Sequence, residues 1–92
     1  MTTWKKQIDD ILKAHGETMD NVVSIVFEDN YWGRVTKKND IDFVLRQRFP
    51  SSRDFAMWTK ERVYFLATYD GGYWIDSVPR NPNGKAIDPI GG

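Results

Sequence analysis

The most constraining feature of this sequence is a pair of β-rich runs on either side of an Asp-Gly-Gly turn. The runs cover residues 62–69 and 73–78, and β-branched and aromatic residues dominate both. Such runs around an Asp-Gly dipeptide are the strongest short-range signal for a β-hairpin, because Asp and Gly tolerate the positive φ angles of a primed turn. The sequence therefore predicts a hairpin over residues 62–78.

A two-residue loop would decide which side chains of this hairpin share a face, whereas a three-residue loop would flip one strand relative to the other. With two residues, one face carries Val63, Phe65, Ala67, Tyr69, Trp74, Asp76 and Val78. The opposite face then carries Tyr64, Leu66, Thr68, Tyr73, Ile75 and Ser77. Both faces hold large apolar groups, so we expect a central hairpin covered on one side and partly on the other. Asp76 is out of place among apolar neighbours, and we expect it near an edge.

Residues 3–15 carry apolar side chains at helical spacing. The stripe consists of Trp4, Ile8, Ile11 and Leu12. Thr2 or Thr3 can cap the first turn, and Gly16 is a natural stop. On the outer face, Asp9 and Lys13 have the i,i+4 spacing of an ion pair. We predict an N-terminal amphipathic helix.

Two segments between this helix and the hairpin are typical of strands. Residues 22–27 are dense in β-branched side chains, and residues 31–36 form a shorter run interrupted by Gly33. Residues 50–57 are interpreted as a loop whose Phe55 and Met57 reach the rim of the core.

Residues 41–49 fit two patterns. As a strand they direct Ile41, Phe43 and Leu45 inward; as a helix they place Ile41, Val44, Leu45 and Arg48 on one face. We favour the strand, because its alternation is cleaner and Pro50 ends the run abruptly.

These elements predict one α+β domain over residues 1–78. An N-terminal helix packs on an antiparallel sheet of four or five strands. Residues 79–92 contain three Pro and three Gly, and we expect an irregular C-terminal tail.

Composition excludes several classes of function. Thirteen basic and 13 acidic residues balance to zero, which disfavours a dedicated DNA coat protein. The chain has no cysteine, so disulfides, thiolate metal sites and cysteine nucleophiles are absent. No apolar run is long enough for a membrane span or a signal peptide. We expect a soluble, cytoplasmic protein that needs no cofactor or metal and does not contact a membrane.

No catalytic motif stands out, and we predict that the protein is not an enzyme. The single histidine, His15, lies where a helix should end, which suits a structural role. The acidic pairs Asp9-Asp10 and Asp40/Asp42 are interpreted as solvated surface. Phosphate loops, dinucleotide fingerprints and nucleophile elbows are not found in the sequence.

The best candidate for partner binding is a basic and aromatic stretch between residues 31 and 53. Aromatic and Arg side chains dominate binding hot spots. The candidate contact residues are Tyr31, Trp32, Arg34, Arg46, Arg48 and Arg53. The same stretch could instead stack on bases and neutralise phosphates, which makes nucleic-acid binding the alternative hypothesis.

The chain ends in Gly91-Gly92, as ubiquitin-like and sulfur-carrier proteins do. Those proteins open with a β-hairpin, whereas this chain opens with a helix. A Gly-Gly carrier is the third and weakest hypothesis.

The C-terminal half also resembles a group of small proteins encoded by tailed bacteriophages and prophages of enteric bacteria. Their pattern is W-T-x-x-x-V-Y-F-x-x-x-Y-D-G-x-x-W-x-x-S-V-P-R-x-P. Here it is Trp58-Thr59, Val63-Tyr64-Phe65, Tyr69-Asp70-Gly71, Trp74, Ser77-Val78-Pro79-Arg80 and Pro82. The likeness also includes Asn21-Val22-Val23-Ser24 and the end Ile90-Gly91-Gly92, and covers a little over half the chain. It departs at Leu66 and around residues 46–53.

This resemblance implies a source rather than a mechanism. Small phage proteins without enzymatic motifs are often accessory factors that bind and disable a bacterial host or defence protein. The leading hypothesis is therefore stoichiometric protein–protein binding in the host cytoplasm, with an anti-CRISPR role against a defence nuclease complex as one form of it. The oligomeric state and the target stay open.

Overall fold

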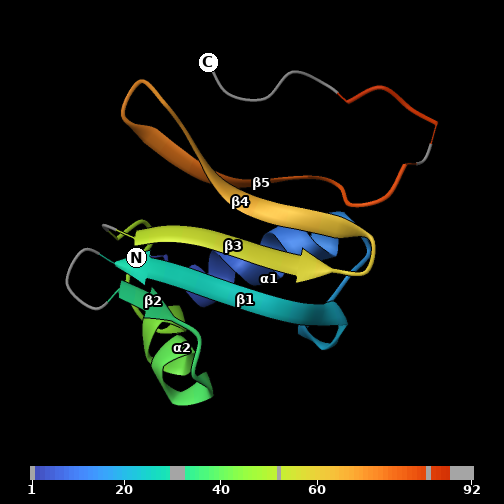
Figure 1. The fold of residues 1–92 in the computed structure, drawn as a ribbon. Helices are drawn as coiled ribbons and strands as arrows, with labels where there is room; N and C mark the ends of the chain where they lie inside the picture. Colours follow the sequence, from blue (N-terminus) through green and yellow to red (C-terminus); the bar gives the residue numbers. More distant parts are fainter. Residues whose placement is uncertain (1, 30–32, 52, 83, 88–92) are drawn as a thin grey trace.

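The computed structural model describes residues 2–29, 33–51, 53–82 and 84–87 (Figure 1). In chain order its elements are α1 (Trp4–Ala14), a 3-10 turn η1 (Met19–Asn21), β1 (Val22–Asp29), β2 (Gly33–Val35), α2 (Lys38–Leu45), β3 (Arg53–Thr59), β4 (Arg62–Tyr69) and β5 (Gly72–Pro79). The strands form one antiparallel sheet in the order β2-β1-β3-β4-β5. The α+β class is confirmed, with a helix on a five-strand antiparallel sheet and a second short helix in addition.

Helix α1 forms where the apolar stripe predicts it. The Lys6 backbone N–H donates to Thr3 Oγ1 at 3.2 Å, which caps the first turn. Gly16 adopts a φ of +72° directly after the last turn, a conformation that glycine reaches without strain. The buried side chains of α1 are Trp4, Ile8 and Leu12.

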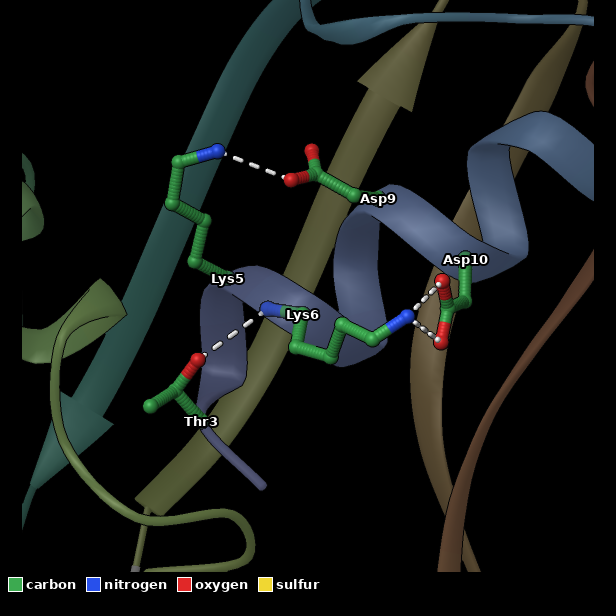
Figure 2. A network of polar contacts seen from close by, with 5 residues as sticks. All are labelled: Thr3, Lys5, Lys6, Asp9 and Asp10. Atoms are coloured by element: carbon green, nitrogen blue, oxygen red, sulfur yellow. Dashed lines mark hydrogen bonds and ion pairs between the residues drawn. The ribbon is translucent and has the colours of Figure 1, made fainter. Parts of the chain in front are cut away.

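Two ion pairs lie on the exposed side of α1. Lys5 Nζ is 2.8 Å from Asp9 Oδ2, and Lys6 Nζ is 2.8 Å from Asp10 Oδ1 (Figure 2). Asp9 therefore pairs one turn toward the N-terminus and not with Lys13 as the spacing suggested. Both pairs are exposed, so each stabilises the helix only slightly.

The predicted hairpin is confirmed as β4 and β5. Asp70 and Gly71 have φ angles of +50° and +80°, as a two-residue primed turn requires. The register pairs Tyr69 with Gly72 and Phe65 with Asp76, which is the predicted parity. The expected central position is wrong, because β5 is the outermost strand, and Asp76 accordingly lies at the edge.

The turn end of the hairpin also extends beyond the rest of the sheet. Strands β3 and β4 pair only through residues 56–58 and 63–65. From Leu66 onward β4 pairs with β5 alone, and Figure 1 shows the hairpin diverging from β3 there.

The strand predicted for residues 41–49 is wrong. Residues 38–45 form α2, with Ile41, Val44 and Leu45 buried, which is the face of the helical alternative. Phe43, which the strand would have turned inward, is 51% exposed. Burying three apolar side chains on one helical face outweighed the weaker period-two pattern.

The fifth strand comes instead from the segment interpreted as a loop. Strand β3 pairs with β1 on one side and with β4 on the other, so it is the centre of the sheet. Phe55 and Met57 are core residues rather than plugs at its rim. Their alternation with Asp54, Ala56 and Trp58 is a strand signal that the preceding Pro50-Ser51 concealed.

The core lies between α1 and one face of the sheet. The ring of Trp4 is 4.7 Å from that of Phe49, 5.1 Å from Phe27 and 5.4 Å from Phe55, measured between centroids. Phe27 and Phe49 meet Trp4 edge to face, an arrangement that stabilises beyond simple area burial. In Figure 1 this helix lies behind β1 and β3.

Residues 80–82 and 84–87 form no helix or strand, as expected for the Pro/Gly tail. Its beginning is nevertheless attached to the β3–β4 turn. Arg80 Nη1 donates to the Thr59 carbonyl at 2.9 Å, and Asn81 Nδ2 donates to the Lys60 carbonyl at 3.1 Å. Gly91 and Gly92 lie outside the described residues, so the carrier hypothesis stays untested.

Candidate partner-binding surface

The face of the sheet opposite α1 carries apolar side chains, and neither described α-helix lies over it (Figure 1). The strand register places even-numbered positions of β1, β3 and β5 on it, together with odd-numbered positions of β4. We call it the open face, and its apolar members are Val26, Ala56, Trp58, Val63, Phe65, Ala67, Trp74 and Val78. All but Ala67 are partly accessible. This face is turned toward the viewer in Figure 1.

A groove of about 490 Å³ lies over β1 and β3 on the open face. Val26, Ala56 and Trp58 contribute its apolar lining. Glu28 and Asp54 line its polar end, where the register places them directly opposite each other. The groove therefore has an aromatic side chain, Trp58, toward one end and a pair of carboxylates at the other.

The charges of the open face are mostly negative. Its acidic residues are Glu28, Asp54 and Asp76, and its basic residue among the described strand positions is Arg34. Arg34 Nε lies 3.6 Å from Glu28 Oε1. Asp76 Oδ2 accepts from the Trp74 indole N–H at 3.0 Å. The Asp54 carboxylate makes no hydrogen bond or ion pair within the described part of the chain.

The six residues predicted from the sequence do not form one patch. Tyr31 and Trp32 lie outside the described residues. Arg34 lies on the open face and lines its groove. Arg46 and Arg48 are exposed, but they lie after the end of α2. The backbone of Arg48 forms an isolated antiparallel β-bridge with Thr3 there.

Arg53, the sixth, is held inside the fold. Its side chain is 14% exposed, and its Nε lies 3.2 Å from Asp29 Oδ2. Its Nη1 donates to Gln47 Oε1 at 2.6 Å and to Ser51 Oγ at 3.1 Å. These contacts join β3 to the segment after α2. They leave little of the Arg53 side chain accessible to another protein.

A second polar cluster joins the end of α1 to β4 and β5. Tyr64 Oη donates to Glu17 Oε1 at 2.5 Å. Arg62 Nε donates to Ser77 Oγ at 2.8 Å, and His15 Nε2 lies 3.2 Å from the same oxygen. Burial raises the pKa of Tyr64 above its ordinary value, and its hydrogen bond to Glu17 adds to this. Burial also lowers the pKa of His15, with a further contribution from the Arg62 charge.

A serine hydroxyl beside a histidine nitrogen is the pair that nucleophilic catalysis uses. Here Ser77 is only 5% exposed, and its oxygen already accepts a hydrogen bond from Arg62. We interpret this cluster as a clamp that holds α1 on the sheet. His15 thereby fits the structural role suggested by its position.

The sequence pattern predicts half of the open face, although it does not mark that half as a binding site. Hairpin parity grouped Val63, Phe65, Trp74 and Val78 on one face. The half on β1 and β3 was missed because β3 was interpreted as a loop. The alternation from Asp54 to Trp58 could have indicated it.

Among the described residues, no group of three or more His, Cys, Asp or Glu side chains is placed to hold a metal ion. No helix in the same part of the chain is long and apolar enough to cross a membrane.

Comparisons of the chain with models of protein families, with curated proteins and with solved structures find no match.

Proposed function

We propose that the protein is a small binding protein of phage origin that attaches stoichiometrically to a bacterial host or defence protein through its open face. The observation that carries this proposal is the apolar open face, on which Trp58, Phe65 and Trp74 stay partly accessible. A defence nuclease complex such as CRISPR is one target class that fits the proposed source. The protein acts by occupying a surface, without catalysis.

The two faces of the sheet contain comparable apolar side chains but differ in cover. On the inner face, Phe27, Met57 and Tyr64 are completely buried beneath α1, with 0% of their surface exposed. On the open face, Trp58, Phe65 and Trp74 remain partly accessible. Large apolar patches on small proteins mark interaction sites, and Trp is enriched among hot-spot residues.

The outer edge of the sheet is less suited to a partner than its open face. In a two-residue hairpin, Tyr73, Ile75 and Ser77 of β5 direct their backbone groups away from β4. The Ser77 N–H is occupied, because it donates to Asp76 Oδ1 at 2.8 Å. Pro79, at the end of the strand, has no N–H. Both features discourage strand addition along β5.

The test is an affinity pull-down from bacterial lysate, with nuclease treatment and mass spectrometry, using the wild-type protein and matched variants. The variant Trp58→Ser/Phe65→Ser removes two aromatic anchors of the open face. The control Phe43→Ser removes an exposed apolar residue of α2. We expect one stoichiometric protein partner that survives nuclease, is lost with the double variant and is kept with the control.

Three results would contradict this proposal. A partner retained by the double variant would place the contact elsewhere. Loss of the partner in Arg46→Ala/Arg48→Ala alone would return the site to the basic residues beside α2. Recovery that depends on nucleic acid, with steep salt dependence, would favour the alternative of nucleic-acid binding through those residues.

A further inference from the structure

We infer that the partner inserts an arginine or lysine side chain, flanked by apolar residues, into the groove between Glu28, Asp54 and Trp58. This inference rests on the proposed function and specifies the chemistry of the bound protein. It reverses the sign of the charges expected from the sequence, where the candidate contacts were basic.

The first argument is the like-charge pair at the polar end of the groove. Glu28 and Asp54 are direct neighbours across β1 and β3. Like charges directly opposite each other in a sheet are destabilising. Arg34 offsets this repulsion only in part, because its contact with Glu28 is 3.6 Å long and its side chain is 72% exposed. An incoming cation would relieve the remaining repulsion.

The second argument is that the same groove also holds an aromatic side chain, four residues along β3 from Asp54. Trp58 lines the same groove, and Ala56 separates it from Asp54 along β3. Residues two apart on a strand share a face, so the indole and the carboxylate project to the same side. A guanidinium or ammonium group can bind the carboxylates while its alkyl stem lies over Val26 and Ala56, and the apolar partner residue beside it packs on the indole.

The third argument is the charge of the whole face. Three carboxylates and one guanidinium surround the apolar band, so the open face repels phosphate groups and attracts cationic protein surfaces. A groove of about 490 Å³ accommodates a long cationic side chain with its neighbours. A basic and apolar protein segment therefore fits this face better than a nucleic acid does.

The inference is tested by NMR titration of the labelled full-length protein with single amino-acid probes. The probes are N-acetyl-arginine amide, its neutral counterpart N-acetyl-norleucine amide, and N-acetyl-glutamate amide. We expect the arginine probe to shift the amide signals of Val26, Ala56 and Trp58 at low salt. The glutamate probe should leave them unchanged, and the norleucine probe should need about tenfold higher concentration.

Two double variants carry the controls. Glu28→Gln/Asp54→Asn keeps the shape of the groove and removes its charge, and we expect about a tenfold weaker response to the arginine probe. This variant should unfold at an equal or higher urea concentration than wild type, because a like-charge pair is lost. Asp9→Asn/Asp10→Asn removes two carboxylates from α1 and should leave the response unchanged.

Equal shifts from the arginine and norleucine probes would overturn the inference, as would an unchanged response in the Gln/Asn variant. Shifts of the same signals on raising the protein concentration alone would identify a second copy as the occupant and also overturn it. The two proposals can fail separately. The natural partner could be lost with Trp58→Ser/Phe65→Ser but kept with Glu28→Gln/Asp54→Asn. The open face would then be the binding site, and only the inferred insertion of a cationic side chain would be wrong.

Discussion

The two faces of the sheet differ in what covers them and in the polar contacts they make. On the inner face α1 buries Phe27, Phe55 and Met57, and the buried or partly buried polar side chains there have internal partners such as Arg53 with Asp29. On the open face the aromatic side chains stay partly accessible, and the Asp54 carboxylate has no hydrogen bond or ion pair among the described residues. The inner face holds the fold together. The open face combines apolar area with unneutralised charge, which suits binding.

The two sides can be compared through one residue type, because Trp4 of α1 packs against the inner face and Trp58 of β3 lies on the open face. Trp4 is 0% exposed, packs on three aromatic rings and donates its indole N–H to Ser51 Oγ at 2.9 Å. Trp58 is partly accessible on the open face. The same side chain therefore serves as a core residue in one place and as a candidate anchor in the other.

The largest expected effect on the free energy of unfolding comes from comparing Trp4 with Trp58. Trp4→Ala should lower the free energy of unfolding by about 3–5 kcal/mol, since it leaves a cavity that the surrounding rings cannot fill. Trp58→Ala should cost less, about 1–2 kcal/mol, because part of this side chain is already accessible to solvent. Urea unfolding followed by far-UV circular dichroism measures both. Equal losses would mean that the open face is as much a part of the core as the inner face.

The next largest effect concerns the two arginines of the predicted site. Arg53→Ala should cost about 2–3 kcal/mol, because it removes a partly buried ion pair to Asp29 and two hydrogen bonds to Gln47 and Ser51. Arg34→Ala, which removes an exposed ion pair, should change the free energy of unfolding by less than about 0.5 kcal/mol. The same urea experiment compares them. A destabilised Arg34→Ala variant would show that the pair with Glu28 has a structural role.

The third effect concerns the polar clamp of the inner face, where Tyr64 donates to Glu17. Tyr64→Phe removes the hydrogen bond to Glu17 and should cost about 1 kcal/mol at neutral pH. In the unfolded chain a tyrosine loses its proton near pH 10.0, whereas the raised pKa keeps Tyr64 protonated in the folded protein. The wild type should therefore lose stability as the pH rises above this value.

The Tyr64→Phe variant lacks this group, so its loss of stability at alkaline pH should be smaller than that of the wild type. Unfolding curves at several alkaline pH values check the difference. Parallel curves for the two proteins would show that the environment of Tyr64 does not favour its protonated form.

The smallest effect belongs to the solvent side of α1. Lys5→Gln and Lys6→Gln should each cost about 0.3–0.5 kcal/mol, since each removes one exposed i,i+4 pair. At about 1 M NaCl these differences should disappear, because the screening length falls to about 3 Å. Thermal unfolding at low and high salt measures both. A loss that persists at high salt would indicate that the lysine stems contribute by packing.

Local patterns predicted the first helix and the hairpin, because both are specified by neighbouring residues. The apolar stripe with Thr3 and Gly16 defines α1, and Asp70-Gly71 defines the turn and the parity of β4 and β5. Both predictions for residues 41–57, a strand over 41–49 and a loop over 50–57, were wrong. Residues 38–45 form a helix, while the central strand comes from the predicted loop.

The error has a physical reason. Over eight residues, a helical face of Ile41, Val44 and Leu45 competes with a period-two alternation, and short apolar runs do not distinguish the two. What decides between them is the partner available in the folded protein. Residues 53–59 pair with β1 and β4 at once, so they occupy the central place in the sheet, and residues 38–45 pack their apolar face elsewhere in the core.

For the site, composition and the six candidate residues indicated binding rather than catalysis, and that prediction remains to be tested. Their position could not be predicted, because it depends on contacts between segments far apart in the chain. Arg53 is engaged by Asp29 and Gln47, while Glu28, Asp54 and Trp58 meet only once β1 and β3 pair. Spacing along the chain specifies helices and turns through local hydrogen bonds and steric limits. Which face of the sheet α1 covers, and therefore which side chains remain accessible, is set by the packing of the whole domain.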